Sequence, residues 1–170
     1  SCLSCDIEEQ NKVLDYINVA KADGAACVFG GGRWEGAGAT SDMFVSPTIF
    51  TGVSNDMRIA REEVFGPVLA VIPFDDEEEA YAIANDSAYG LGAGLWTSDI
   101  RKAIDGSARL EAGTVWINTY RALSYTSPFG GYTRSGIGRE GGMEAFKEYL
   151  QTKSVWICTD SDVDNPFIMR

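Results

Sequence analysis

The spacing of apolar residues predicts helices and strands that alternate along the chain. Over residues 6–23 the apolar positions follow the helical repeat, and Gly24 supplies a natural helix stop. A strand is expected next, over residues 25–29. Residues 68–74, VLAVIPF, are almost continuously apolar, which is typical of a strand covered on both faces.

A second series of elements follows the acidic segment DDEEE. Negative charge is favoured at a helix N-terminus, so we expect Asp75 to be an N-cap and Glu78 to complete a capping box. Strands are predicted at residues 91–97 and 114–118, with a helix over 98–113 between them. Closely alternating strands and helices favour parallel strands with right-handed crossovers. The predicted fold class is therefore α/β, a three-layer α/β/α arrangement with a mostly parallel sheet.

The last third of the chain is less regular. Residues 119–142 form a long loop rich in Gly, Ser, Thr and aromatic residues, and a helix over 143–150 and a strand over 153–160 are predicted after it. A loop of this length in a compact domain indicates a functional surface. With 170 residues, 45% of them hydrophobic, the chain is interpreted as a single domain over residues 1–170.

Charge and composition exclude several classes of function. A net charge of −11 repels phosphate backbones and anionic lipids, so nucleic acid and membranes are not expected partners. No apolar run approaches the ~18 residues of a membrane span, and the first ten residues lack signal-peptide features, which favours a soluble, cytoplasmic protein. The chain contains no histidine, which excludes Ser-His-Asp catalysis and HExxH metal sites, and no metal site is expected.

The cysteines and one glycine motif each allow two interpretations. Cys2 and Cys5 form a CxxC pair, for which an incidental pair is favoured over a redox or metal role because no βαβ unit precedes it. Residues 136–141, GIGREG, have the spacing of a dinucleotide-binding turn. A loop rather than a strand precedes them, so a flexible lead into the next helix is favoured.

The segment REEVFGPV, residues 61–68, raises a sharper question. Pro67 favours an extended lead from Val64 into the following strand, so the side chains before it are held rigidly. A carboxylate and an aromatic ring fixed near strand ends could bind a ribose and stack on a nicotinamide. Spacing alone favours the alternative, a turn with solvated glutamates.

Four motifs in order, REEVFGPV, NDSAYGL, GTVWIN and SPFGGYTRSGIGRE, make the chain similar to the C-terminal part of the catalytic domain of the aldehyde dehydrogenase superfamily. The segments DIEEQNKVLDYI and SVWI also resemble the corresponding family segments, so the resemblance covers nearly the whole chain. It implies an NAD(P)-dependent oxidoreductase that converts an aldehyde to a carboxylic acid. The implied partners are a small-molecule aldehyde and the cofactor NAD or NADP.

The resemblance also assigns roles to individual residues. It implies that Glu63 binds the hydroxyls of the nicotinamide ribose, that Phe65 packs near the nicotinamide ring and that Lys12 lies near the ribose. The family's aldehyde channel maps onto Arg121, Leu123 and Phe129. An arginine there could favour an anionic aldehyde or could point away from the channel.

The departures from the family concern the reaction itself. The family's nucleophilic cysteine lies in a Gly-Gln-x-Cys context, which surrounds none of Cys2, Cys5, Cys27 and Cys158. We therefore expect no catalytic residue in this chain and no activity of the chain alone. The family's activating glutamate, oxyanion-stabilising asparagine and Rossmann domain are also absent, and Thr133-Arg134 stands where many members have a lysine.

The resemblance predicts that a terminal strand, residues 153–158, joins subunits of a homo-oligomer. The chain begins with Ser, which fits a cut piece of a longer enzyme or a natural truncation. An alternative function is a stand-alone interaction module that associates with intact subunits through SVWI. A third is a plain nucleotide-binding domain with its own affinity for NAD.

Overall fold

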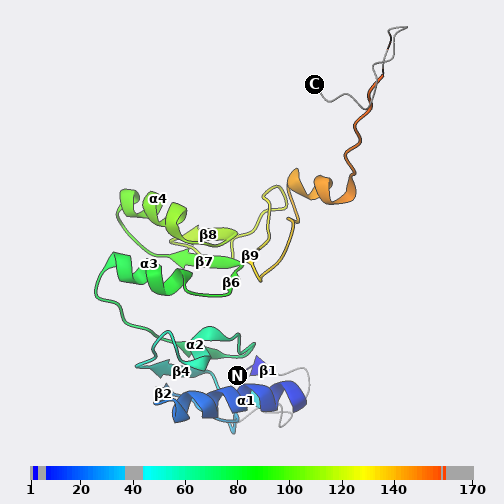
Figure 1. The fold of residues 1–170 in the computed structure, drawn as a ribbon. Coiled ribbons are helices and arrows are strands. Elements are labelled where there is room, and N and C mark those ends of the chain that lie inside the picture. The colour runs from blue at the N-terminus through cyan, green and yellow to red at the C-terminus, as the bar shows by residue number, and fades with distance from the viewer. Residues whose placement is uncertain (1, 4–6, 37–43, 158, 160–170) are drawn as a thin grey trace, which may run out of the picture.

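The computed structural model describes residues 2–3, 7–36, 44–157 and 159, and Figure 1 shows their arrangement. Cys5 and Cys158, on which part of the cysteine interpretation depends, lie outside these residues. The first half of the chain contains β1 (Cys2–Leu3), α1 (Ile7–Ala22), β2 (Ala26–Phe29), β3 (Phe44–Val45), β4 (Thr48–Thr51), α2 (Arg58–Arg61) and β5 (Val68–Ala70). The second half contains α3 (Glu77–Asn85), β6 (Tyr89–Gly90), β7 (Gly92–Leu95), α4 (Ile100–Arg109), β8 (Thr114–Ile117), β9 (Tyr132–Thr133) and the 3-10 helix η1 (Glu144–Tyr149).

Helix α1 ends as the sequence predicts. Gly24 has a φ of +97°, a left-handed conformation that glycine adopts at little cost. The amide of Gly24 donates to the carbonyl of Lys21 at 3.2 Å, and that of Ala25 donates to Ala20 at 3.0 Å. These two bonds form a Schellman motif, which satisfies the last carbonyls of the helix.

The main hydrophobic core lies in the first half of the chain. Helix α1 packs beside the sheet β2-β4-β5, in which β2 and β4 are antiparallel and β4 and β5 are parallel (Figure 1). Strand β4 is the central strand, and Phe50 on it has no exposed surface. The buried residues of this cluster are Val13, Tyr16, Ile17, Ala20, Ala25, Val45, Phe50, Val53, Ile59 and Val64.

The strand predicted over residues 68–74 is shorter than expected, because β5 ends at Ala70. Leu69, Val71 and Phe74 are exposed, so the expectation of a strand covered on both faces is not met by this chain alone. No other element of the described chain packs on these three side chains closely enough to bury them. They form apolar surface that other protein is expected to cover.

In the second half, helix α4 connects the parallel strands β7 and β8 (Figure 1). The carboxylate of Asp99 caps α4 by accepting from the amide of Arg101 at 2.8 Å. The helix ends at Arg109, earlier than the predicted end at Gly113. Gly113 instead allows a close backbone approach, since a Cβ there would lie 1.7 Å from the carbonyl oxygen of Gly130.

The capping box of α3 is one residue later than predicted. Asp76, not Asp75, is the N-cap, and its carboxylate accepts from the amide of Glu79 at 2.9 Å. Glu79 reaches back to the amide of Asp75 at 2.7 Å. Glu78 is free to bind Arg109 on α4 at 2.8 Å, and this guanidinium holds the pKa of Glu78 below its usual range.

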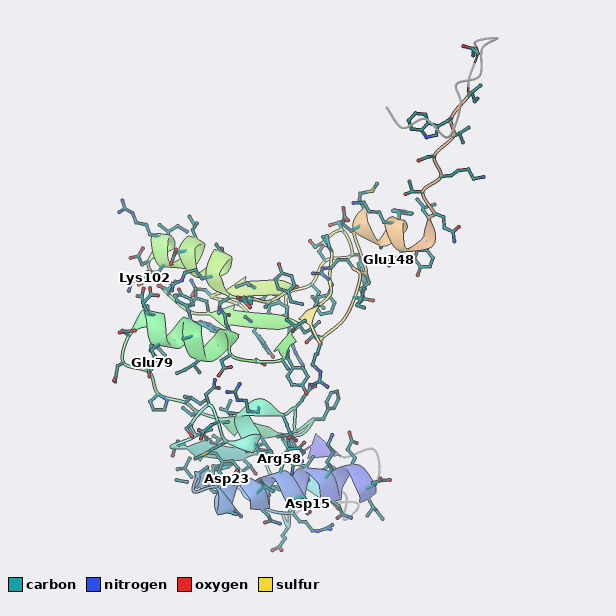
Figure 2. The ribbon with its side chains drawn as sticks, viewed as in Figure 1. Asp15, Asp23, Arg58, Glu79, Lys102 and Glu148 are labelled. Carbon is teal, nitrogen blue, oxygen red and sulfur yellow. The ribbon has the colours of Figure 1, made fainter. Side chains whose placement is uncertain are left out.

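Helices α3 and α4 are joined by ion pairs. Lys102 on α4 pairs with Glu77, the first residue of α3, and the same helix carries the labelled Glu79 in Figure 2. Arg109 also lies over the ring of Tyr81, with its Cζ 4.1 Å from the ring centroid. Tyr81 and Ala103 are the buried hydrophobic side chains among the described residues after residue 64.

The α/β class is confirmed, but the strands do not form one sheet. The parallel pairs are β4–β5 and β7–β8, and the antiparallel pairs are β1–β3, β2–β4 and β6–β9. The parallel pair β7–β8, connected by α4, agrees with the predicted crossover. Strand β5 instead pairs with β4, and the short helix α2 between these two strands was not predicted. The expected mostly parallel sheet is divided into separate pieces.

The C-terminal region differs from the prediction. The helix expected over residues 143–150 is a 3-10 helix without buried residues. Residues 153–157 form no strand and extend away from the rest of the molecule (Figure 1). A strand needs a partner for its backbone groups, and none of the described residues supplies one here. Within the described ranges, no helix is long and apolar enough to cross a membrane.

Candidate functional site

A groove of about 660 Å³ lies where the two halves of the chain meet. Glu62, Glu63 and Phe65 line it from the first half, and Tyr89 and Arg134 line it from the second. The fold therefore brings three motifs that are distant in the sequence, REEVFGPV, NDSAYGL and GYTRSG, to one place. Carboxylates, aromatic rings and a guanidinium group therefore line the same groove.

The backbone at Phe65 is strained. Its φ is +56°, in the left-handed region that costs energy for a residue with a side chain, so the predicted extended geometry is wrong at this position. The ring is 69% exposed. Strain of this kind persists where the surroundings hold it, and it is common at ligand sites.

The neighbours of Phe65 hold this conformation in place. Val64 belongs to the buried core. Gly66 packs against α1 so closely that a Cβ there would lie 2.7 Å from a methyl carbon of Val13. The carbonyl of Pro67 accepts from the amide of Thr48 at 2.8 Å. The segment is therefore packed against its surroundings on both sides of Phe65.

The two adjacent glutamates have different surroundings. Glu62 accepts a hydrogen bond from the hydroxyl of Tyr16 at 2.6 Å and one from Nε of Arg58 at 2.9 Å. These bonds hold the pKa of the Glu62 carboxyl below its usual range. Glu63 is exposed and, among the described residues, has no hydrogen-bond or ion-pair partner. Its carboxylate is thus available to a ligand.

Lys12 lies beside this groove rather than in it. It is exposed on α1 and lines a hollow of about 370 Å³ together with Asp15, Tyr16 and Arg58. Figure 2 labels Asp15 on α1 and Arg58 close to it. The structure therefore brings Glu63 and Phe65 together in one groove and places Lys12 in a different hollow, which Tyr16 also lines.

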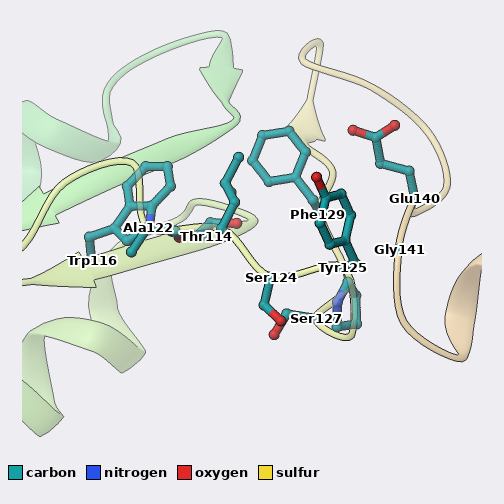
Figure 3. A pocket seen from close by; sticks show the side chains of 11 residues that line it. Thr114, Trp116, Ala122, Ser124, Tyr125, Ser127, Phe129, Glu140 and Gly141 are labelled. Carbon is teal, nitrogen blue, oxygen red and sulfur yellow. The ribbon is translucent and has the colours of Figure 1, made fainter.

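A second pocket, of about 690 Å³, lies beside β8, whose residues Thr114 and Trp116 line it (Figure 3). Leu123 and Phe129 line it, as the resemblance implies, whereas Arg121 does not. The guanidinium of Arg121 stacks on the ring of Tyr120, with its Cζ 5.5 Å from the centroid.

The same pocket contains residues that sequence reasoning missed, namely Trp116, Tyr125 and Glu140. Glu140 faces Phe129 because the two residues exchange backbone hydrogen bonds of 2.7 and 2.8 Å. The indole of Trp116 donates to the carbonyl of Ala122 at 2.7 Å, which holds the loop against β8. The one available signal was that Glu140 belongs to the same sequence motif as Phe129.

The glycines of GIGREG serve loop geometry. Gly136, Gly138 and Gly141 have positive φ values, and the strand before them, β9, has only two residues and pairs antiparallel with β6. Arg139 donates to the carbonyls of Gly131 and Gly138 at 3.0 and 2.7 Å, which fastens the loop to itself. The structure thus agrees with a loop rather than a Rossmann turn. In the part of the chain that the structure describes, no group of acidic or cysteine side chains could hold a metal ion.

An α/β fold whose loops build two neighbouring hollows, with a few polar groups among aromatic side chains, is typical of enzyme domains that bind small molecules. The chain belongs to the aldehyde dehydrogenase family, whose family profile matches residues 5–155. The resemblance seen in the four sequence motifs is thereby confirmed.

Several known proteins are similar to this chain. A betaine aldehyde dehydrogenase from Brucella anthropi is 46% identical over 159 residues, which is 94% of this chain and 32% of that protein. An aldehyde dehydrogenase from Mycobacterium tuberculosis, solved in complex with NAD+, is 48% identical with a TM-score of 0.83, covering 92% of this chain and 32% of that one.

Two further solved structures are equally informative. A point mutant of betaine aldehyde dehydrogenase from Staphylococcus aureus, in complex with NAD+, has a TM-score of 0.92 at 41% identity and covers 98% of this chain and 34% of its own. An indole-3-acetaldehyde dehydrogenase from P. syringae, in complex with NAD+, has a TM-score of 0.84 at 48% identity and covers 89% and 30%. The chain thus spans about a third of the length of these relatives.

Proposed function

We propose that this chain acts as the C-terminal part of the catalytic domain of a longer NAD(P)-dependent aldehyde dehydrogenase. In that enzyme it supplies part of the nicotinamide site and part of the substrate channel. Family membership supports this proposal, and several similar structures are complexes with NAD+. The observation that carries it is the groove in which Glu63, which has no partner in the described part of the chain, lies beside the exposed, strained Phe65.

The groove residues suit the nicotinamide half of the cofactor. The carboxylate of Glu63 accepts hydrogen bonds from the ribose hydroxyls, and the ring of Phe65 packs against the flat nicotinamide. Lys12 adds positive charge on the α1 side of the Tyr16–Glu62 contact. A nicotinamide cofactor held there would supply hydride-transfer chemistry to the longer enzyme. Residues of this chain orient the ring for that transfer.

The nucleophilic step requires residues outside this chain. The four cysteines lack the family's sequence context, and Cys27, the free cysteine among the described residues, lines neither the groove nor the second pocket. We therefore propose that the longer enzyme supplies the cysteine and the water-activating glutamate, and that this chain alone is inactive.

The second pocket suits a neutral or cationic aldehyde. Its walls include the rings of Trp116, Tyr125 and Phe129, and Glu140 adds negative charge. Aromatic rings with a carboxylate attract cations, whereas an anion is repelled. Relatives of this chain are named for betaine aldehyde and for indole-3-acetaldehyde. Selection of an anionic aldehyde by Arg121 gains no support from the geometry.

Replacing Phe129 with Ala tests the channel assignment. In the longer dehydrogenase the KM for aldehyde is expected to rise roughly tenfold, because the pocket loses a large apolar contact. The KM for NAD should stay constant. Steady-state rates of NADH formation measure both values. Phe146→Ala, which removes an exposed ring outside the pocket, is the matched control. An unchanged aldehyde KM for Phe129→Ala would remove Phe129 from the channel.

A second candidate function is the interaction module, and the apolar C-terminal segment favours it. Val155, Trp156 and Ile157 are 70 to 95% exposed and have no strand partner in the described chain. An unpaired apolar segment is a template for pairing with another chain. In the longer enzyme the same segment would join subunits of a homo-oligomer.

The substitution Trp156→Lys is expected to weaken self-association of the chain. A lysine in this segment removes apolar surface and places like charges opposite each other in a symmetric contact. Sedimentation velocity over a range of concentrations measures the change. Ile104→Lys, at an exposed position on α4, is the control. Equal weakening by both substitutions would argue that association is non-specific.

A further inference from the structure

Three side chains from α1 and α2 meet beside the groove. The hydroxyl of Tyr16 donates to an oxygen of Glu62 at 2.6 Å, and Nε of Arg58 donates to the same oxygen at 2.9 Å. The guanidinium of Arg58 also lies over the ring of Tyr16, with its Cζ 5.0 Å from the centroid. Figure 2 shows where Arg58 lies relative to α1. The carboxylate of Glu62 is therefore held from two helices.

This cluster differs from an ordinary surface ion pair. The exposed Arg58–Glu62 pair, four residues apart, would contribute little by itself. Tyr16, however, is only 9% exposed and its ring belongs to the core cluster with Val13 and Ile17. The hydroxyl of Tyr16 is consequently a fixed point, and its bond ties Glu62 to the core.

The backbone conformation after α2 determines in which direction the side chains that follow Glu62 point. Glu62 is the C-cap of α2 and is extended, with φ −118° and ψ 146°. Extended backbone at Glu62 directs the side chain of Glu63 to the opposite face, and the left-handed φ of +56° at Phe65 then ends the extended stretch. Glu62 lines the groove, but its carboxylate is bound by Tyr16 and Arg58, and Val64 belongs to the core. Glu63 has no partner among the described residues, and Phe65 is 69% exposed in the same groove. Anchored and presented side chains therefore alternate.

We infer that Glu62 is a positioning residue that, through Tyr16 and Arg58, holds Glu63 and Phe65 in the orientation that receives the nicotinamide ribose. This inference rests on the proposed function of Glu63 and Phe65. Glu62 also lines the groove, but its role here is to position its neighbours, because the carboxylate oxygen is already bound by Tyr16 and Arg58. It acts by restricting the residues next to it, so that less conformational freedom is lost when the cofactor binds.

The hydrogen bond between Tyr16 and Glu62 also changes the pKa of Tyr16. The acceptor Glu62 raises the pKa of Tyr16 above its usual value, and burial adds to the effect. Arg58 opposes this shift. Lys12, also on α1, adds its positive charge near Glu62. A raised pKa of Tyr16 stabilises the folded chain fully at pH values below the ordinary tyrosine pKa. This contribution is lost as the pH rises through the higher pKa of Tyr16 in the folded chain.

Tyr16→Phe is the principal test, because it removes one hydroxyl and keeps the core ring. In the longer dehydrogenase, we expect the KM for NAD to rise about five- to tenfold, equivalent to ~1 kcal/mol. The KM for aldehyde and the Tm should change little, whereas a merely structural role would affect all three. Glu62→Gln should have a smaller effect than Glu62→Ala, because the amide oxygen still accepts from Tyr16.

Two controls match these changes. Tyr149→Phe removes the hydroxyl of an exposed tyrosine, and Glu111→Gln neutralises an exposed carboxylate; both lie outside the groove. Neither should alter the KM for NAD. In the 170-residue chain, tyrosine absorbance is followed as a function of pH for the wild type and for Tyr16→Phe. The difference between the two titrations reports the pKa of Tyr16. Its pKa should fall towards the ordinary value in Glu62→Gln.

The outcomes distinguish the positioning role of Glu62 from the proposed cofactor site that contains Glu63 and Phe65. A raised NAD KM in Tyr16→Phe and Glu62→Ala, with smaller loss in Glu62→Gln, supports the positioning role. If Glu63→Gln impairs NAD use but Tyr16→Phe and Glu62→Ala do not, the positioning role is wrong and the proposed site stands. If Glu63→Gln also has no effect, the proposed site itself is wrong. An unshifted Tyr16 pKa would overturn the contact that carries the inference.

Discussion

Replacing Glu63 with Gln is expected to raise the KM for NAD of the longer dehydrogenase by roughly 10- to 100-fold. A hydrogen bond to a charged acceptor contributes about 1.5 to 3 kcal/mol, and each 1.4 kcal/mol is a factor of about ten. Gln keeps the size of the side chain but loses the charge and one of the two equivalent acceptors. Steady-state kinetics with NAD as the varied substrate measures the effect.

The effect should be specific to the cofactor. Glu111→Gln makes the same chemical change at an exposed position outside the groove and is expected to behave like wild type. The Tm of both variants should match that of the unaltered enzyme, because Glu63 makes no contact that stabilises the fold among the described residues. An unchanged KM for NAD in Glu63→Gln would remove the central residue of the proposed site.

Phe50→Ala should lower the free energy of unfolding of the 170-residue chain by about 3 to 5 kcal/mol. Phe50 lies on the central strand β4 and is completely buried against α1 and the residues around it. Truncation removes its apolar contacts and leaves a cavity that the packed neighbours cannot fully close. Urea denaturation followed by circular dichroism measures the change.

Phe74→Ala provides the comparison for this prediction. Its ring is 59% exposed, so the same truncation there should cost no more than about 0.5 kcal/mol. Both variants replace phenylalanine with alanine, so they differ in how deeply the removed ring is buried. Similar losses from the two variants would mean that the cluster around Phe50 is not the main source of stability.

Local signals in the sequence were sufficient for the parts of the fold that depend on local physics. The end of α1 at Gly24 was predictable because a left-handed residue closes a helix within a few positions. The α/β class was predictable because apolar runs and helical repeats alternate. The capping box was misplaced by one residue because Asp75 and Asp76 are chemically equivalent, and only the backbone conformation at Asp76 distinguishes them.

Features that depend on distant contacts could not be predicted. The strand expected at residues 153–158 needs a partner that the described chain does not supply. The left-handed φ of Phe65 follows from the anchors around it and from no property of phenylalanine. Glu140 enters the second pocket through its pairing with Phe129. A ligand site at residues 61–68 could be predicted only from the resemblance of REEVFGPV to a family motif, because the residue spacing alone favoured a solvated turn.

The uneven distribution of buried side chains has a consequence for how the chain opens. Among the described residues, almost all of the core lies between residues 13 and 64, and Tyr81 and Ala103 are the only buried hydrophobic side chains after residue 64. Backbone amides of α1 and β4 should therefore exchange their hydrogens slowly, through global unfolding, while those of residues 77–157 exchange through smaller openings. The wall of the groove that carries Glu63 would stay formed while the opposite wall, with Tyr89 and Arg134, repeatedly opens and closes.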